Sequence, residues 1–370
     1  MEKFTFLVVL IILSVCGGCK NILQKEVNEP IKAYDIDFNW GEGGPNGFAK
    51  PGLWADANPE DHVNWYTALG CNVIQSFAVS CNGYAWYKNG IVPEQPGLKY
   101  DFLTEEVRLA HKKNIKVFGY FCAGANTKWG LEHPDLSYGI PSSPHIPYTT
   151  QYLDYLCASI EDAIKKTDMD GVFIDWLWNP GTTMEPYPPL RWMYCEQVMY
   201  EELMGQIFPG KNKITSEIEL QFRRKAIDRC WRRIRETVKK TKPDCLIWLT
   251  SCQLTSRDIA GSDMLKEVDW VLNEAGDIAT TESVRGMLGP HTRLVTCLAN
   301  WNGQDPTEII PVAIKEKVGL YGFTKPVEGS MMPPVDYYLS RHVDSLKGDE
   351  RNIAVLARAY NNLPFDFVKK

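Results

Sequence analysis

The chain has 370 residues, with 40 Lys and Arg against 46 Asp and Glu, which gives a formal net charge of −6. Its 44% hydrophobic and 23% charged residues are typical of a globular protein and exclude a disordered, collagen-like or coiled-coil chain. The mildly negative charge gives no electrostatic basis for nucleic-acid binding, so no nucleic-acid partner is expected.

The N-terminus carries the pattern of an export signal. A Lys is followed by an apolar run over residues 4–15 and then by the sequence CGGC. This run is shorter than the ~20 residues that span a bilayer, and it fits the apolar region of a secretory signal. The arrangement resembles a bacterial lipoprotein signal, with Cys19 as the acylated first residue; plain secretion is the alternative. We expect a signal peptide over residues 1–18, a polar tether over 19–32, and a lipid-anchored protein of the bacterial cell envelope, in the outer membrane or facing the periplasm.

Short runs rich in β-branched and aromatic residues then alternate with segments of helical periodicity. The predicted strands are Ala33–Trp40, Asn72–Ser80, Ile115–Cys122, Gly171–Trp176, Cys245–Ser251, Val268–Ala275, Arg293–Trp301 and Val318–Lys325. The predicted helices between them include Pro59–Leu69, Leu103–Lys113, Thr149–Lys166, Ile218–Lys240 and Thr307–Lys317.

Strands that alternate with helices indicate βαβ units and a parallel sheet, and eight such units indicate a (β/α)8 TIM barrel. We expect one barrel domain over residues 33–370. An open doubly wound sheet would normally have a glycine-rich phosphate turn that opens a helix after the first strand, and the glycine-rich stretch GEGGPNGFAKPG lacks a helix start directly behind it. A long insertion, residues 179–216, follows the fourth strand, and its middle, Arg191–Phe208, has a helical pattern.

The cysteines do not suggest a disulfide framework or a metal site. Apart from Cys16 and Cys19 there are nine, an odd number at irregular spacing, and several lie in apolar runs. Free cysteine behaves there as a small buried hydrophobe. No CxxC or His-x-x-x-His pair appears in this part of the chain, so we expect neither a metal nor a cofactor.

On a TIM barrel, polar residues at the C-terminal ends of the strands form the active site. The fourth predicted strand ends at Asp175 and the sixth at Glu274, while Asp35 and Asp37 share one face of the first. Asp37 lies nearer the strand end and is the better ligand candidate, with Asp35 as a buried brace. The further candidates for substrate binding at strand ends are Trp40, Asn126, Trp176, Trp178, Asn300, Trp301 and Lys325.

Carboxyl groups that converge beside tryptophans are suited to cleaving a glycosidic bond. One carboxyl protonates the leaving oxygen, and the other attacks the anomeric carbon or activates water. Tryptophan faces stack on sugar rings, and polar groups bind the hydroxyls. The nucleophile elbow GxSxG is absent from the sequence.

The segment DMDGVFIDWLWNP resembles the fourth-strand nucleophile segment of TIM-barrel glycoside hydrolases, especially α-L-fucosidases and the hypothetical glycosyl hydrolases similar to them. The later segment SEIELQFRRKAIDRCWRRIRETVKKTKPDCLIW is similar to the helix that leads into the fifth strand of those hypothetical hydrolases. The resemblance implies that Asp175 is the nucleophile. Glu274 is the positional candidate for the acid/base, and Asp277, Glu217 and Glu219 could serve instead.

The sequence therefore predicts a retaining glycosidase, similar to α-L-fucosidases, that acts on an extracellular or periplasmic oligo- or polysaccharide. A non-catalytic glycan-binding lipoprotein on the same barrel is the alternative, and a scaffold lipoprotein with an exposed apolar patch is a third hypothesis. The sugar, the linkage and the oligomeric state stay open.

Overall fold

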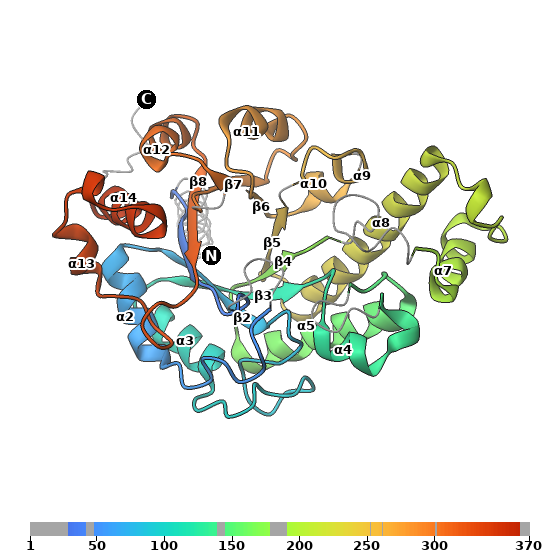
Figure 1. The fold of residues 1–370 in the computed structure, drawn as a ribbon, viewed down its shortest axis with the longest axis horizontal. Coiled ribbons are helices and arrows are strands. Elements are labelled where there is room, and N and C mark those ends of the chain that lie inside the picture. The colour runs from blue at the N-terminus through green and yellow to red at the C-terminus, as the bar shows by residue number, and fades with distance from the viewer. Residues whose placement is uncertain are drawn as a thin grey trace, which may run out of the picture.

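The computed structural model describes residues 29–41, 48–138, 145–177, 191–251, 253–260, 262–299 and 302–362. Eight parallel strands close into one barrel in chain order, so the TIM-barrel prediction is confirmed (Figure 1). The strands are β1 (Lys32–Ile36), β2 (Val73–Val79), β3 (Lys116–Cys122), β4 (Gly171–Asp175), β5 (Leu246–Ser251), β6 (Trp270–Asn273), β7 (Arg293–Cys297) and β8 (Gly319–Thr324).

Helices surround the strands (Figure 1). They are α2 (Pro59–Leu69), α3 (Phe102–His111), α4 (Thr127–Glu132), α5 (Thr150–Thr167), α7 (Tyr194–Met204), α8 (Ser216–Thr241), α9 (Arg257–Ala260), α10 (Met264–Glu267), α11 (Ile278–Arg285), α12 (Pro306–Lys315), α13 (Val335–Leu339) and α14 (Gly348–Asn362). Short 3-10 turns are η1 (Pro134–Leu136), η2 (Lys211–Lys213) and η4 (Val343–Ser345). The helix predicted within the insertion is present as α7, which lies beside α8 at the edge of the molecule.

The sequence of helix α8 determines where the helix begins and which of its faces is buried. Thr215 caps it by accepting a hydrogen bond from the Ile218 amide. Its residues at four-residue steps, Phe222, Ala226, Cys230 and Ile234, are buried as the periodicity predicted. The Arg and Lys side chains of the helix lie on its other faces and form surface ion pairs such as Arg233 with Asp154.

Aromatic rings fill the barrel interior. Tyr321 on β8 lies 5.6 Å from Trp248 on β5 and 6.1 Å from Phe173 on β4, measured between ring centroids. Neither β4 nor β5 is a neighbour of β8, so the Tyr321 ring meets the other two across the lumen and not along the sheet. Phe118 and Trp270 extend the same layer. The C-terminal ends of the strands are therefore supported by a rigid, close-packed layer of aromatic rings.

The cysteines within the described ranges are buried, as the sequence predicted, and they are free thiols. They are Cys71, Cys81, Cys122, Cys157, Cys195, Cys230, Cys245 and Cys297. Within these ranges, no helix is both long enough and apolar enough to span a bilayer. The predicted signal peptide and Cys19 lie outside the described residues, as do Trp178, Asn300 and Trp301.

One carboxyl group is buried between helices and barrel, away from the strand ends. Glu106 of α3 is fully buried, neither of its carboxyl oxygens has a hydrogen-bond partner within the described residues, and burial raises its pKa to about 8, although the nearby Ser76 side chain acts to lower it. In the unfolded chain a glutamate titrates near ~4.3. Between these two values folding takes up a proton, so the contribution of Glu106 makes the fold less stable as pH rises.

Glu106→Gln, which is nearly isosteric and cannot ionise, should therefore stabilise the protein more at pH 8 than at pH 5. We expect the difference between the two pH values to be on the order of 1–3 kcal/mol in the free energy of unfolding. Urea unfolding of wild type and variant at both pH values measures it. The control is Glu236→Gln on the exposed side of α8. A Glu106→Gln effect that is equal at both pH values would contradict the assignment.

Candidate active site

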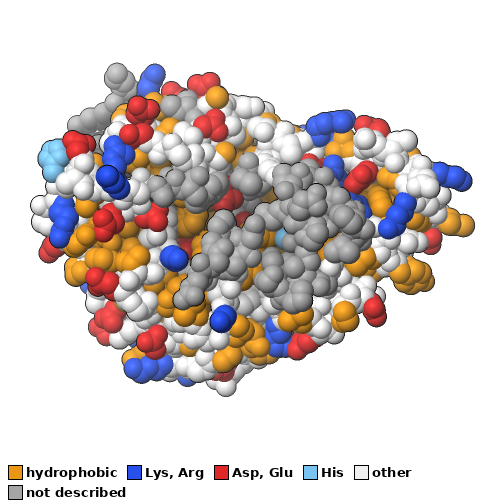
Figure 2. All heavy atoms as spheres, viewed as in Figure 1, with side chains coloured by type: hydrophobic (Ala, Val, Ile, Leu, Met, Phe, Trp, Pro, Cys, Tyr) orange, Lys and Arg blue, Asp and Glu red, His pale blue; other side chains and the backbone are white. Residues whose placement is uncertain are grey.

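The structure brings Asp175 and Glu274 to the same end of the barrel. Asp175 is the last residue of β4, and Glu274 directly follows β6. The Glu274 amide still donates to the Ser251 carbonyl of β5 at 3.3 Å, so the strand direction continues through this residue. Because all strands are parallel, both carboxyl groups lie at the C-terminal end, where TIM-barrel active sites form. Figure 2 shows acidic side chains in a hollow near the centre of the face seen there.

Asp175 is held as an anion by two hydrogen-bond donors. The Tyr120 hydroxyl donates to its Oδ2 and the Trp176 amide to its Oδ1, both at 2.7 Å. Burial raises the pKa of Asp175 to about 6, against the lowering effect of these two bonds. The Cys81 sulfur lies 3.2 Å from the same Tyr120 oxygen and helps to hold the hydroxyl in place. Asp175 is therefore ionised at neutral pH and fixed in orientation.

Glu274 has the opposite environment. The hydrogen bond that it accepts from the Thr250 hydroxyl is long, 3.4 Å. Burial, followed by the charge of Asp175, raises the pKa of Glu274 to about 8, and Asp37 adds a smaller effect in the same direction. The sequence predicted that burial raises the pKa of Glu274, whereas the additional effect of the Asp175 charge is visible only in the structure. Glu274 therefore keeps its proton at neutral pH.

Asp37 is the third carboxyl group of this site. It follows β1, its amide donates to the Thr324 carbonyl of β8 at 2.9 Å, and its Oδ1 accepts from the Asn39 amide at 2.6 Å. Burial raises its pKa to about 7, with Asn39 and Trp40 acting to lower it and Asp175 to raise it. Asp35 lies deeper, 3.5 Å from the Tyr321 hydroxyl. Asp35 is thus buried below the rim and Asp37 lies at it, in the order along the chain that the sequence predicted, while the roles of brace and substrate ligand stay predictions.

Aromatic rings from three separate segments form a wall beside Asp175. The Trp176 ring lies 6.5 Å from that of Trp40, 5.3 Å from that of Phe48 and 5.0 Å from that of His145. Trp176 has a φ of 52°, a left-handed conformation that is uncommon for a bulky residue and typical of functional sites. A Cβ at Gly124 would lie 2.1 Å from the Trp176 carbonyl oxygen, so only glycine fits there. We call Trp40, Phe48, Trp176 and His145 the aromatic wall.

Several candidates from the sequence have structural partners. Asn126 caps α4 by accepting from the Trp129 amide at 2.9 Å. Asp277, considered for the acid/base role, caps α11 by accepting from the Thr280 amide at 2.6 Å. Glu217 and Glu219, considered for the same role, pair with arginines at 3.1 and 2.5 Å. Lys325 follows β8 and is exposed.

A buried ion pair fixes the middle of the insertion, just before and within α7. Arg191, 6% exposed, donates its Nε to Glu196 at 3.0 Å and its Nη1 to Glu219 at 2.5 Å. Glu196 is fully buried and also accepts from the Tyr138 hydroxyl at 2.8 Å and from the Trp192 amide at 2.7 Å. Such a network is satisfied only in one arrangement, so it sets the position of α7 relative to the barrel. Across the ranges that the structure describes, no three His, Cys, Asp or Glu side chains are grouped so as to hold a metal ion.

Comparison with protein families gives one match. Residues 58–176 match the model of a family described as hypothetical glycosyl hydrolase 6, which covers less than half of the chain. The matched segment runs from the start of α2 to Trp176 and so includes Tyr120 and Asp175. Comparison with curated proteins gives no match.

Solved structures of glycoside hydrolases share the fold. α-L-Fucosidase isoenzyme 2 from Paenibacillus thiaminolyticus is similar with a TM-score of 0.60 and 17% identity over 90% of this chain and 49% of that one. The glycoside hydrolase domain of PgaB (BpsB) from Bordetella bronchiseptica gives 0.53 and 13%, over 80% and 93%. A β-galactosidase from Bacillus circulans gives 0.50 and 12%, over 90% and 57%.

The chain thus resembles TIM-barrel glycoside hydrolases, α-L-fucosidases among them, as the sequence predicted. It spans about half the length of the fucosidase to which it is similar. The solved structures show the shared fold, and the family match is to hypothetical glycosyl hydrolases over residues 58–176. Neither comparison identifies the catalytic residues.

Proposed function

We propose that this chain is a retaining glycosidase in which Asp175 is the nucleophile and Glu274 the acid/base. The observation that carries the proposal is the unequal environment of the two carboxyl groups. Asp175 accepts two short hydrogen bonds and has a pKa of about 6, whereas Glu274 accepts one long bond and has a pKa of about 8. Near neutral pH one group is ionised and the other protonated, as glycoside cleavage requires.

The reaction would proceed in two steps. Asp175 attacks the anomeric carbon while Glu274 gives its proton to the leaving oxygen, which yields a glycosyl ester and a free alcohol. Esterification removes the negative charge of Asp175, and that charge is one cause of the raised pKa of Glu274. The pKa of Glu274 therefore falls in the intermediate. The glutamate is then a carboxylate that can take a proton from the water that cleaves the ester.

The remaining groups of the site would bind the sugar. Asp37 would accept hydrogen bonds from sugar hydroxyls, and Trp40 and Trp176 of the aromatic wall offer apolar faces for ring stacking. Phe48 and His145 pack against Trp176 and support that surface. Trp178, Asn300, Trp301 and Lys325 stay predicted contacts for an oligo- or polysaccharide substrate outside the cytoplasm.

The alternative is a glycan-binding protein without activity. It would use the same aromatic wall but would not need Asp175 and Glu274 to differ in pKa. Incubation of the purified protein with a panel of glycans, followed by analysis of released sugars, separates the two functions. Binding without release of sugar from any glycan would favour the alternative.

We also propose that the protein is a cell-envelope lipoprotein, acylated at Cys19. The short apolar run that ends in Gly17, Gly18 and Cys19 supports this. Expression in a bacterial host with labelled palmitate should label the wild type and leave Cys19→Ser unlabelled. Cys16→Ser is the matched control and should stay labelled. Label retained by Cys19→Ser would refute the anchor.

Asp175→Asn should lower kcat by about three orders of magnitude or more, because the amide cannot form the glycosyl ester. The two side chains are nearly isosteric, so the barrel should remain folded, which circular dichroism and thermal unfolding check. Asp175→Gly leaves space for azide, and added azide should restore turnover of a substrate with an activated leaving group by forming a glycosyl azide. Near-normal turnover by Asp175→Asn would exclude the nucleophile role.

Glu274→Gln should lose most activity on a natural glycan and keep the first step on a substrate with an activated leaving group, which needs little protonation. In the wild type, kcat/KM should rise with pH as Asp175 ionises near 6 and fall as Glu274 loses its proton near 8. Glu274→Gln should lose the alkaline limb. Equal losses on both substrates would transfer the acid/base role to another carboxyl group.

A further inference from the structure

A buried asparagine, Asn39, joins three segments at the C-terminal rim of the barrel. It lies just beyond β1 and is 3% exposed. Its main-chain amide donates to Oδ1 of Asp37 at 2.6 Å, and its side-chain Oδ1 accepts from the Cys81 amide, beyond β2, at 2.8 Å. Its main-chain carbonyl accepts from the Ala49 amide at 2.6 Å, next to Phe48 of the aromatic wall. Asn39 therefore connects the end of β1 with the segment after β2 and with the wall.

From Cys81 the contacts continue to the proposed nucleophile. The Cys81 sulfur lies 3.2 Å from the Tyr120 hydroxyl oxygen, and this oxygen lies 2.7 Å from Oδ2 of Asp175. A hydroxyl group has one hydrogen, and a carboxylate is a better acceptor than a thiol. Tyr120 therefore donates to Asp175, and the Cys81 thiol donates to the Tyr120 oxygen. Burial, followed by the neighbouring Cys122 side chain, raises the pKa of Cys81, so the thiol keeps the hydrogen that this bond needs.

These contacts form one chain between two carboxyl groups of the site. Its members in order are Asp37, Asn39, Cys81, Tyr120 and Asp175. Hydrogen bonds in such a chain polarise one another, so each bond depends on the position of the next.

The two ends of the chain need fixed donors because they share one rim. The charge of Asp175 raises the pKa of Asp37, so the two carboxylates repel each other when both are ionised. A donor offsets this repulsion only while it stays in line with the carboxylate oxygen. Asn39 holds the donor to Asp37, which is its own amide, by anchoring its side chain on Cys81. The same anchor fixes Cys81, which supports the donor to Asp175.

We propose that Asn39 is a positioning residue of the glycosidase site, which holds Asp37 directly and Asp175 through Cys81 and Tyr120. The inference rests on the proposed function of these two carboxyl groups. It assigns to Asn39 no contact with the reacting atoms.

Titration of the carboxyl groups tests the proposal without turnover. The full chain is labelled with aspartate that carries ¹³C in the side-chain carboxyl group, and Asp37→Asn and Asp175→Asn identify the two signals. In Asn39→Ala both groups should titrate at a pH higher than in the wild type by about 0.5 or more, because their donors are no longer held in line. In Cys81→Ala only Asp175 should shift, since the main-chain amide of residue 81 still anchors Asn39. Cys81→Ala carries the test if Asn39→Ala does not fold.

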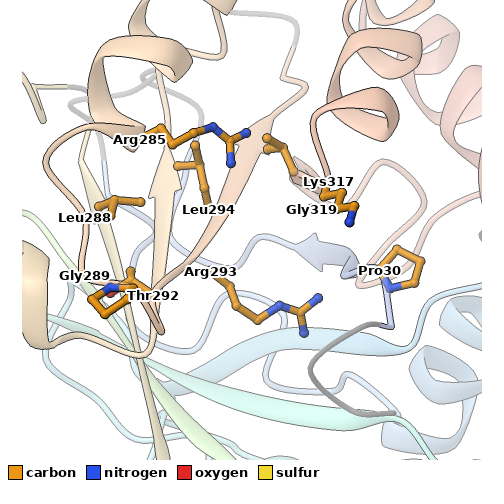
Figure 3. Close-up of a pocket in the computed structure, with 11 residues that line it drawn as sticks. Pro30, Arg285, Leu288, Gly289, Thr292, Arg293, Leu294, Lys317 and Gly319 are labelled. Carbon is orange, nitrogen blue, oxygen red and sulfur yellow. The ribbon is translucent and has the colours of Figure 1, made fainter. Parts of the chain in front are cut away.

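Two control variants separate this role from ordinary packing. Asn82→Ala removes a buried side chain that donates to the Ala49 carbonyl at 3.2 Å and accepts from the Tyr84 amide at 3.1 Å. Thr292→Val removes a hydrogen bond to the Val268 carbonyl, 2.8 Å long, beside a cavity of about 390 Å³ at the opposite end of the barrel (Figure 3). Both variants should lower the free energy of unfolding and leave both titrations as in the wild type.

Turnover gives a second measurement. Asn39→Ala should move the acid limb of kcat/KM to higher pH by the same amount as the Asp175 titration, whereas a loss of packing alone would lower kcat/KM at every pH. Unchanged titrations in Asn39→Ala, or an equal shift in Asn82→Ala, would overturn the inference. Shifted titrations in a protein that releases no sugar from any glycan would refute the glycosidase and leave the effect of Asn39 on the two carboxyl groups in place.

Discussion

The pairing of β1 with β8 is the constraint on which the rest of this molecule depends. It joins the two ends of the fold through a parallel register that runs from Lys32 with Leu320 to Ile36 with Thr324. The next bond, from the Asp37 amide to the Thr324 carbonyl, extends the pairing to the rim. Without this closure the sheet would have two open edges, and Asp37 would not face Asp175 and Glu274 across a common space.

Burial at that rim raises the pKa of all three carboxyl groups, Asp37, Asp175 and Glu274. Unequal hydrogen bonding then makes their pKa values different. Water removal favours the neutral form of each group. Tyr120 and the Trp176 amide offset this for Asp175, whereas the donor to the Glu274 carboxyl group within the described part of the chain is the distant Thr250 hydroxyl. A tyrosine two positions before the end of β3, together with the Trp176 amide, therefore lowers the pKa of Asp175 and favours its ionised form. The chemistry of the site depends on this neighbouring strand as much as on the acids themselves.

The barrel could be predicted because its signals are local and periodic. Each strand begins within two residues of its predicted start, and α2 has the predicted bounds. Asp175 and Glu274 could be placed because parallel strands bring their ends to one rim. Tyr120 was missed because the sequence alone does not distinguish a tyrosine that only packs in the core from one that donates a hydrogen bond to a site residue. Phe48 and His145 follow glycine- and proline-rich sequence stretches that have no hydrophobic period, so the sequence did not predict where their rings lie.

The buried thiols have a consequence for how opening of this fold can be observed. Cys71, Cys81 and Cys297 are buried, and burial raises the pKa of each thiol well above its ordinary value. The thiolate, which is the reactive form, is therefore scarce as long as the barrel is closed. An alkylating reagent reacts only with molecules that have transiently opened around a given cysteine. The free thiols of the described residues are spread along the chain from Cys71 to Cys297. The order in which they are modified therefore reports the relative local stability of the different parts of the barrel.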